Sequence, residues 1–136
     1  MEHLESLNET WETLNALLTE KGVLIVAVPN CSSYDAKKYG AYWAAYDVPR
    51  HLWHFTPGTI QQLGSKHGFI LAERHPMPFD AFYVSMLTEK NMRRSCPFLR
   101  GMLTVTWAWF HALVKKERSS SMIYVFRKKK SDKTLE

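Results

Sequence analysis

Residues 46–57 read Tyr-Asp-Val-Pro-Arg-His-Leu-Trp-His-Phe-Thr-Pro. The stretch combines one arginine, two histidines and an aspartate with aromatic side chains, immediately before the start of a helix. Titratable groups packed among aromatic rings are typical of the wall of a site rather than of a solvated loop. A strand that ends at Pro29-Asn30 precedes the stretch and a helix that Gly68 terminates follows it, so the sequence predicts an α/β fold around it.

Two elements are predicted ahead of this stretch. Residues 3–20 carry apolar side chains at three- and four-residue steps, with polar residues opposite, which predicts an amphipathic helix that stops at Gly22. Residues 23–28 form an unbroken apolar run, rich in β-branched side chains and bounded by Gly22 and Pro29. This pattern predicts a strand of an α/β sheet that is covered on both faces.

The remaining chain predicts further helices and strands of the same domain. Thr56-Pro57 supplies an N-cap and a first-turn proline, so a helix is predicted from here to Gly68. The later elements are, in order, a strand at 69–73, helices at 81–90 and 97–114, and a strand at 122–126. We therefore expect a single domain over residues 1–130 and a tail at 131–136, whose last two residues resemble a cloning remnant.

The composition indicates a packed globular domain without a nucleic-acid partner. The chain has 136 residues, 46% of them hydrophobic, and a formal net charge of +5. Residues 127–130 contribute four of the positive charges, so we assign the basic balance to a solvated tail rather than to a phosphate-binding patch. Cys31 and Cys96 lack metal-ligand spacing and the first residues do not resemble a secretory leader, which favours free thiols in the cytoplasm.

Short motifs along the chain resemble the C-terminal half of class I S-adenosylmethionine-dependent methyltransferases that act on small molecules (type 11, 12 or 23). In chain order these motifs are Glu2-His3-Leu4, Leu18 to Gly22, Val26 to Asn30, Pro49 to Pro57 and Gly68-Phe69. The family's G-x-G-x-G loop and the acidic residue that binds the ribose of the cofactor are missing here. The resemblance therefore covers only the half of the family's fold that follows the cofactor-binding loop.

This resemblance implies part of a Rossmann-like methyltransferase sheet with flanking helices. The strands at 23–28, 69–73 and 122–126 would be the family's fifth, sixth and seventh strands, with the seventh inserted antiparallel between the other two. The complete enzyme would transfer a methyl group from S-adenosylmethionine to a small-molecule acceptor. Because the glycine-rich half is missing, we expect this chain alone neither to bind the cofactor strongly nor to be active. The alternative is a non-enzymatic α/β module for self-association.

The stretch 46–57 also supplies the candidate catalytic residues. An acceptor atom must lose a proton as it attacks the methyl group, and His51 and His54 are suited to take that proton at neutral pH. The alternative is that both histidines brace the loop through backbone carbonyl groups. Arg50 is a candidate for gripping a carboxylate or phosphate of the substrate. The candidate substrate-binding residues are Asn30, Tyr46, Asp47 and Arg50, of which Asn30 and Asp47 have turn-forming alternatives.

Glu2 and His3 are candidates for cofactor binding, because the family's fourth strand opens onto the cleft at this motif. In a related subset of the family, an E-x-x-E-H motif and a later histidine hold a divalent metal. Here the first glutamate of that motif is missing, which leaves Glu2, His3 and one of His51 or His54 as an incomplete set of ligands. A frayed N-terminus is favoured over a metal site formed by these ligands, so no metal site is predicted.

Exposed apolar surface is expected to determine which partners the chain binds. The strand at 23–28 would have an open edge, and the first helix would expose apolar surface around Trp11 and Leu14. Residues 99–114 are apolar nearly all round but too short to span a bilayer. Basic residues on both sides of this segment would suit contact with a membrane surface. Packing of the segment against the sheet or against a partner is favoured over that contact. Besides the substrate, the expected partner is a second copy or the missing N-terminal half.

Overall fold

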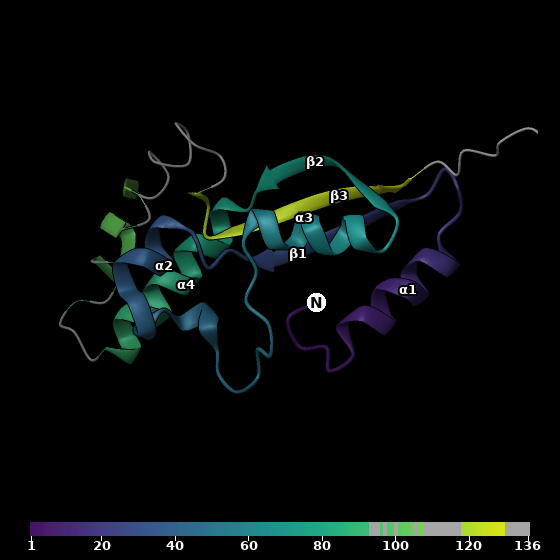
Figure 1. The fold of residues 1–136 in the computed structure, drawn as a ribbon. Helices are drawn as coiled ribbons and strands as arrows, with labels where there is room; N and C mark the ends of the chain where they lie inside the picture. The colour runs from purple at the N-terminus through teal and green to yellow at the C-terminus, as the bar shows by residue number, and fades with distance from the viewer. Residues whose placement is uncertain (93–95, 97, 100, 105, 108–117, 130–136) are drawn as a thin grey trace, which may run out of the picture.

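The computed structural model describes residues 1–92, 96, 98–99, 101–104, 106–107 and 118–129. This part of the chain is a mixed α/β domain built on one sheet (Figure 1). The helices are α1 (Leu7–Leu17), α2 (Tyr34–Tyr39), α3 (Pro57–Lys66) and α4 (Pro78–Asn91), with short 3-10 helices η1 (Gly40–Tyr42) and η2 (Ala44–Tyr46). The strands are β1 (Val23–Pro29), β2 (Phe69–Pro76) and β3 (Ser121–Lys128).

The sheet is antiparallel and has the order β1-β3-β2. β3 pairs along the whole of β1, with Val23 opposite Arg127 and Pro29 opposite Ser121. β3 also pairs with β2, where a bulge lies between Leu71 and Glu73. The last strand therefore lies between the other two and antiparallel to both, which is the order expected from the sequence. Within the described chain, β1 and β2 are the two edge strands.

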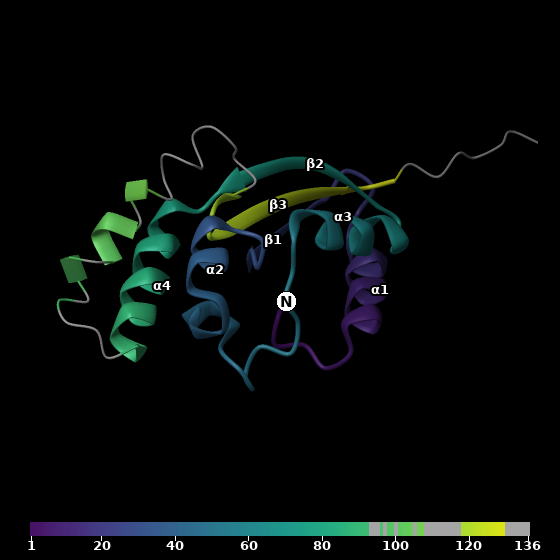
Figure 2. The ribbon, with the colours of Figure 1, turned by 60° about the vertical axis from the view of Figure 1, so that its left-hand side comes forward.

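Helices α1 and α3 cover one face of the sheet, whereas α2 and α4 lie together beyond the end of the strands (Figures 1 and 2). The main core forms between the sheet and the first pair of helices around Trp11, which is 0% exposed. Its indole ring meets Phe69 and Phe126 edge to face, with centroid distances of 5.5 and 5.3 Å. The expectation that Trp11 belongs to bare surface is therefore wrong, because the residue fills the centre of the core.

On the opposite face of the sheet no described element covers β1, so the prediction of a strand covered on both faces is also wrong. Along β1, Val26 and Val28 are buried, while Ile25 is 65% exposed. Ile70 on β2 is likewise exposed. An apolar run shows that a segment is a strand, but it does not show how many layers cover it, because both faces of such a run look alike in the sequence.

Helix α3 begins and ends as its sequence predicts. The Thr56 side chain accepts a hydrogen bond from the Thr59 amide, and Pro57 occupies the first turn. The chain reverses at Gly68, where φ is +78°, a conformation that favours glycine. Helix α1 is shorter than predicted because residues 1–4 make contacts outside it, which are described below.

A second core lies between α2, η2 and α4. Trp43 is buried there, and its indole nitrogen donates to Asp35 at 2.9 Å. The Tyr39 hydroxyl lies 3.1 Å from Glu89 and 3.2 Å from Thr104, and burial raises the pKa of Tyr39 to about 12. This core fixes the position of η2, which carries two of the backbone carbonyl groups used by the candidate site.

Part of the predicted helix at 97–114 lies outside the described residues. Residues 98–99, 101–104 and 106–107 are helical, and β3 extends beyond the predicted strand at both ends. None of the helices in the described ranges has the length and apolar character needed to cross a bilayer. Cys31 and Cys96 are free thiols, as expected.

Candidate functional site

The N-terminal segment packs against the loop that contains the stretch 46–57. The Glu2 carbonyl oxygen accepts hydrogen bonds from the amides of Leu52 at 2.8 Å and Trp53 at 3.3 Å. The Trp53 indole nitrogen donates to the Leu4 carbonyl oxygen at 2.6 Å. Both views place the N-terminus between this loop and α1 (Figures 1 and 2). The expectation of a frayed terminus is therefore wrong, and Glu2 and His3 are held beside the loop.

Two histidine rings meet where these segments touch. His51 Nδ1 lies 2.8 Å from the Ala45 carbonyl oxygen, and His3 Nδ1 lies 3.0 Å from the Arg50 carbonyl oxygen. A carbonyl oxygen only accepts hydrogen bonds, so each Nδ1 must carry a proton. The lone pair of each neutral ring is then on Nε2. The two rings pack edge to face with centroids 4.6 Å apart.

Carboxylates surround the Nε2 atoms of the two histidines. Oε1 of Glu2 lies 3.9 Å from Nε2 of His3 and 3.9 Å from Nε2 of His51. Oδ2 of Asp47 lies 3.8 Å from Nε2 of His51. These distances exceed a hydrogen bond. The two Nε2 atoms and the carboxylate oxygens therefore face one another without direct hydrogen bonds between them.

Glu2 is the most enclosed acid of this group. Burial of Glu2 disfavours its charged form, but its own backbone amide, the N-terminal ammonium group and His51 outweigh burial, so the pKa of the carboxyl is lowered. Oε2 of Glu2 is buried without a hydrogen-bond partner, and the Met1 ammonium nitrogen lies 3.2 Å from it. The carboxylate therefore stays charged at neutral pH and presents Oε1 to the histidines.

Asp47 and Arg50 form the exposed rim of the site. Asp47 ends η2 in the left-handed region, with φ at +40°, which turns the chain toward His51. Its Oδ1 accepts a hydrogen bond from Arg50 at 2.6 Å, and this bond and the aspartate charge raise the pKa of the guanidinium group. The Arg50 side chain is largely exposed, so it stays accessible to an anion in solvent.

His54 and Tyr46 brace the loop. Nε2 of His54 lies 3.0 Å from the Tyr46 carbonyl oxygen, which only accepts, so the ring donates there. The two rings pack edge to face at 5.0 Å, and Tyr46 packs in the same way on Trp43 at 5.1 Å. His54 thus makes the contact expected from the bracing alternative, and His51 makes the same kind of contact with Ala45.

Asn30 is buried and fully engaged in the turn that follows β1. Its Oδ1 accepts from the amide and the hydroxyl of Ser32 at 3.0 and 2.7 Å, and its Nδ2 donates to the Ser119 carbonyl oxygen at 3.0 Å. Asn30 therefore connects the ends of β1 and β3, as the turn-forming alternative predicts. Its amide is not presented to a substrate in this structure.

Glu2, His3 and His51 have the geometry of a partial metal site. One ligand atom from each lies within 4.8 Å of the others, which no other His, Cys, Asp and Glu group in the described ranges achieves. A tetrahedral zinc ion with bonds of about 2.0–2.2 Å holds its ligand atoms about 3.3–3.6 Å apart, so the 3.9 Å separations from Glu2 Oε1 are slightly longer than a bound zinc ion requires. Each imidazole also donates its Nδ1–H to a backbone carbonyl, as metal-binding histidines do. The residues present therefore fit a divalent cation.

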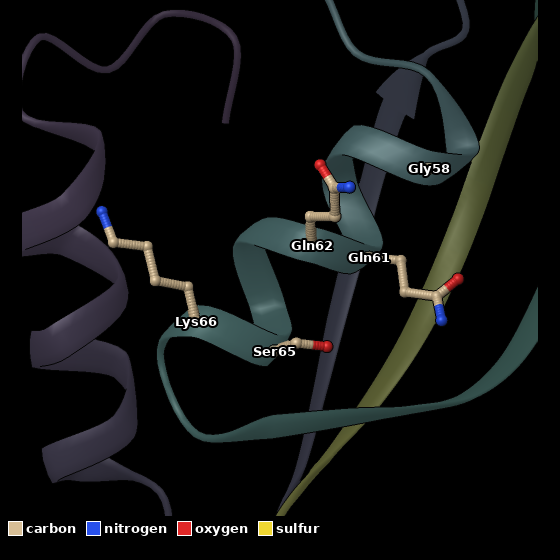
Figure 3. Close-up of a pocket in the computed structure, with 5 residues that line it drawn as sticks. All are labelled: Gly58, Gln61, Gln62, Ser65 and Lys66. Carbon is tan, nitrogen blue, oxygen red and sulfur yellow. The ribbon is translucent and has the colours of Figure 1, made fainter.

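Two surface hollows lie outside this cluster. One, of about 630 Å³, lies along α3 and is lined by Gln61, Lys66 and their neighbours (Figure 3). Gln61 accepts a hydrogen bond from Arg74, and Lys66 donates to Asn8, so these polar groups hold the helix in place. The second, of about 470 Å³, lies between the start of α1 and Trp53. Neither hollow includes a candidate residue predicted from the sequence.

No family model matches the chain, and no curated protein matches it. The functional interpretation therefore depends on the chain's own motifs and geometry. The structure brings the predicted catalytic residue His51 beside the predicted cofactor-binding residues Glu2 and His3. The sequence did not indicate the carbonyl groups of Ala45 and Arg50 that orient the two rings. Backbone acceptors of this kind leave no signal in residue identity.

Proposed function

We propose that this chain is the acceptor side of a methyltransferase that uses S-adenosylmethionine to methylate a small molecule. In this proposal β1, β3 and β2 are the fifth, seventh and sixth strands of the class I fold. The support comes from the motifs in their family order, together with a last strand placed centrally and antiparallel to its neighbours. S-adenosylmethionine would supply the methyl group from the sulfonium centre, and residues outside this chain would bind most of it.

The observation that carries the proposal is the orientation of the two ring nitrogens of His51. Its Nδ1–H is held by Ala45, so the basic Nε2 faces Glu2 and Asp47 from a largely buried ring. S-adenosylmethionine would supply its methyl group to an acceptor hydroxyl, and Nε2 of His51 would take the proton that this hydroxyl loses. The two carboxylates stabilise the resulting imidazolium, and Arg50 at the rim attracts an acceptor that carries a carboxylate or phosphate.

The test is methyl transfer by the protein expressed from the complete reading frame that contains this chain. His51→Ala is expected to lower kcat by about 10²- to 10⁴-fold with little change in KM, because the general base acts in the chemical step. His75→Ala is the control, since His75 is an exposed residue of β2 and its ring bonds to Glu73 on the same strand. A kcat of His51→Ala equal to that of wild type would assign His51 to bracing.

The chain alone is expected to show no shift in melting temperature with S-adenosylmethionine. The glycine-rich loop and the ribose carboxylate supply most cofactor recognition in this family, and the chain has neither. Thermal denaturation with excess cofactor measures this, because a ligand at 100 times its dissociation constant adds about 2.7 kcal/mol to stability. A clear upward shift would instead indicate an intact site, assembled from two copies of the chain.

The competing proposal is a self-association module, and the open edge of β1 favours it. Among the described strands β1 bonds only to β3, and its residues from Val23 to Val28 carry no charge that would discourage pairing. Its outward residue Ile25 is exposed. A homodimer that pairs two β1 strands would join the sheets and cover these side chains. Light scattering of wild type and of Ile25→Lys measures whether the chain forms a dimer through β1. It separates the two proposals because self-association requires this dimer and the enzymatic proposal does not.

A further inference from the structure

The second core is closed by polar side chains from three helical segments. Tyr39 comes from α2, Glu89 from α4, and Thr104 from the helical residues 101–104. These residues are 5%, 1% and 2% exposed. In both views α2 and α4 lie side by side (Figures 1 and 2). Buried polar groups are stable only when they are hydrogen-bonded, so the bonds among these side chains determine how firmly the segments are held together.

The hydrogen bonds among these side chains have a defined direction. Nζ of Lys38, a group that only donates, bonds to Oγ1 of Thr104 at 2.6 Å. The hydroxyl oxygen of Tyr39 lies 3.2 Å from this Oγ1 and 3.1 Å from Oε1 of Glu89. An ionised carboxylate only accepts, so the single proton of Tyr39 goes to Glu89, and the proton of Thr104 is available to the Tyr39 oxygen. The bonds therefore run from the ammonium group of Lys38 to the carboxylate of Glu89.

The arrangement depends on the proton of Tyr39. Without it, an oxyanion would lie 3.1 Å from the Glu89 carboxylate in a buried position, and Glu89 would lose the donor that bonds to it. Burial raises the pKa of Tyr39 from 10.0 to about 12, and the charge and hydrogen bond of Glu89 act in the same direction, against hydrogen bonds from Thr104 and Ser85. The folded chain therefore holds this proton more tightly than the unfolded chain does.

The second core also positions the candidate site. The Ala44 amide donates to Oγ1 of Thr88 at 2.9 Å, and Thr88 immediately precedes Glu89 on α4. Ala45 is buried in the same core, and its carbonyl oxygen holds Nδ1 of His51. Packing of α4 on α2 and η2 therefore supports the carbonyl group that orients His51.

We propose that the Tyr39 hydroxyl is a proton-dependent lock of the second core, which loses stability when the hydroxyl ionises. The described groups that face the hydroxyl from the elements packed on α2 are Glu89, Ser85 and Thr104. On α2 itself, Nζ of Lys38 lies 5.5 Å from the centroid of the Tyr39 ring. The lock acts on η2 as well, because η2 is held by α4.

The direction of the pH effect follows from the raised pKa of Tyr39. A group whose pKa is higher in the folded chain contributes stability that is complete below its unfolded value, here 10.0, and that is lost as the pH rises through its folded value of about 12. Between these values the folded chain binds one more proton than the unfolded chain. The folding equilibrium constant therefore falls by up to about tenfold for each pH unit in this range.

Urea denaturation of the full chain and of Tyr39→Phe, from neutral to alkaline pH, tests this proposal. Phenylalanine keeps the ring and removes the proton. The folding equilibrium constant of wild type divided by that of Tyr39→Phe is expected to be constant below about pH 9 and to fall by up to about tenfold per pH unit above pH 10. The matched control is Tyr42→Phe, since Tyr42 is an exposed tyrosine on η1. Its ratio to wild type should stay within about twofold.

Three results would overturn the proposal. The first is a ratio of wild type to Tyr39→Phe that does not change with pH. The second is an equal fall for Tyr39→Phe and Tyr42→Phe, which would assign the effect to tyrosine ionisation in general. The third comes from ultraviolet absorbance, where the difference between wild type and Tyr39→Phe isolates the ionisation of Tyr39. If that difference appears near pH 10, the ordinary value for tyrosine, the buried hydroxyl does not hold its proton as proposed. Wild type with and without urea gives the same comparison without a variant.

Discussion

Replacing Trp11 with alanine is expected to lower the free energy of unfolding by about 3–5 kcal/mol. The indole ring is fully buried between α1 and the sheet, and it meets Phe69 and Phe126 edge to face. Alanine would leave a cavity that this packing cannot close. Domains of this size are stabilised by about 5–15 kcal/mol, so the variant is expected to lose a large part of its stability. Urea denaturation followed by circular dichroism measures the change.

Two further variants sharpen this test of the core. Leu17→Ala changes an exposed leucine on the same helix and is expected to alter stability by less than about 0.5 kcal/mol. Trp11→Phe is expected to cost less than Trp11→Ala, because the Trp11 indole nitrogen is buried without a hydrogen-bond partner and phenylalanine removes that donor. If Trp11→Ala unfolds at the same urea concentration as Leu17→Ala, the core described here is wrong.

The sequence predicted the elements of the fold better than it predicted their surroundings. Thr56-Pro57 and Gly68 act through the local backbone, so the ends of α3 could be predicted from residue type alone. The burial of Trp11 and the exposure of Ile25 depend on which elements pack on which face, and periodicity carries no such information. The wrong predictions for Trp11 and for the strand at 23–28 both depended on an assumed arrangement of layers around the sheet.

The candidate site shows the same limit. The mixture of titratable and aromatic residues in 46–57 predicted the wall of a site, and it could not divide the roles of its two histidines. That division depends on η2, where the Ala45 carbonyl takes Nδ1 of His51 and the Tyr46 carbonyl takes Nε2 of His54. Each ring therefore bonds to one carbonyl through one nitrogen, and what distinguishes His51 is that its second nitrogen faces the carboxylates of Glu2 and Asp47. Only the folded chain brings Glu2 and His3 to the first of these rings.

Zinc binding is expected to depend on all three residues of the cluster formed by Glu2, His3 and His51. The ligand atoms lie within 4.8 Å of one another, and both histidines are held by backbone carbonyls with Nε2 directed to the same carboxylate. In a calorimetric titration, His3→Ala and His51→Ala are each expected to weaken Zn²⁺ binding by more than about 100-fold. Loss of an outer partner typically costs about 10- to 100-fold, and loss of a ligand costs more.

The matched control for this titration is His75→Ala, which removes an exposed histidine that pairs with Glu73 on β2. Zinc affinity in this variant should equal that of wild type. Equal affinity in His3→Ala, His51→Ala and wild type would refute the cluster as a binding site. A loss in His51→Ala alone would show that zinc binds His51 without the other two residues, which also contradicts the prediction.

The same variants decide which role His51 has, because one nitrogen cannot hold a metal ion and accept a proton together. If His51 is the general base, His51→Ala lowers methyl transfer whether or not a chelator is present, and His3→Ala has a small effect. If His51 is a metal ligand, a chelator lowers the activity of wild type to that of His3→Ala and His51→Ala alike. The two proposals therefore predict opposite responses of wild type to the chelator. His3→Ala distinguishes them a second time, since His3 takes part in the metal cluster and not in the proton transfer.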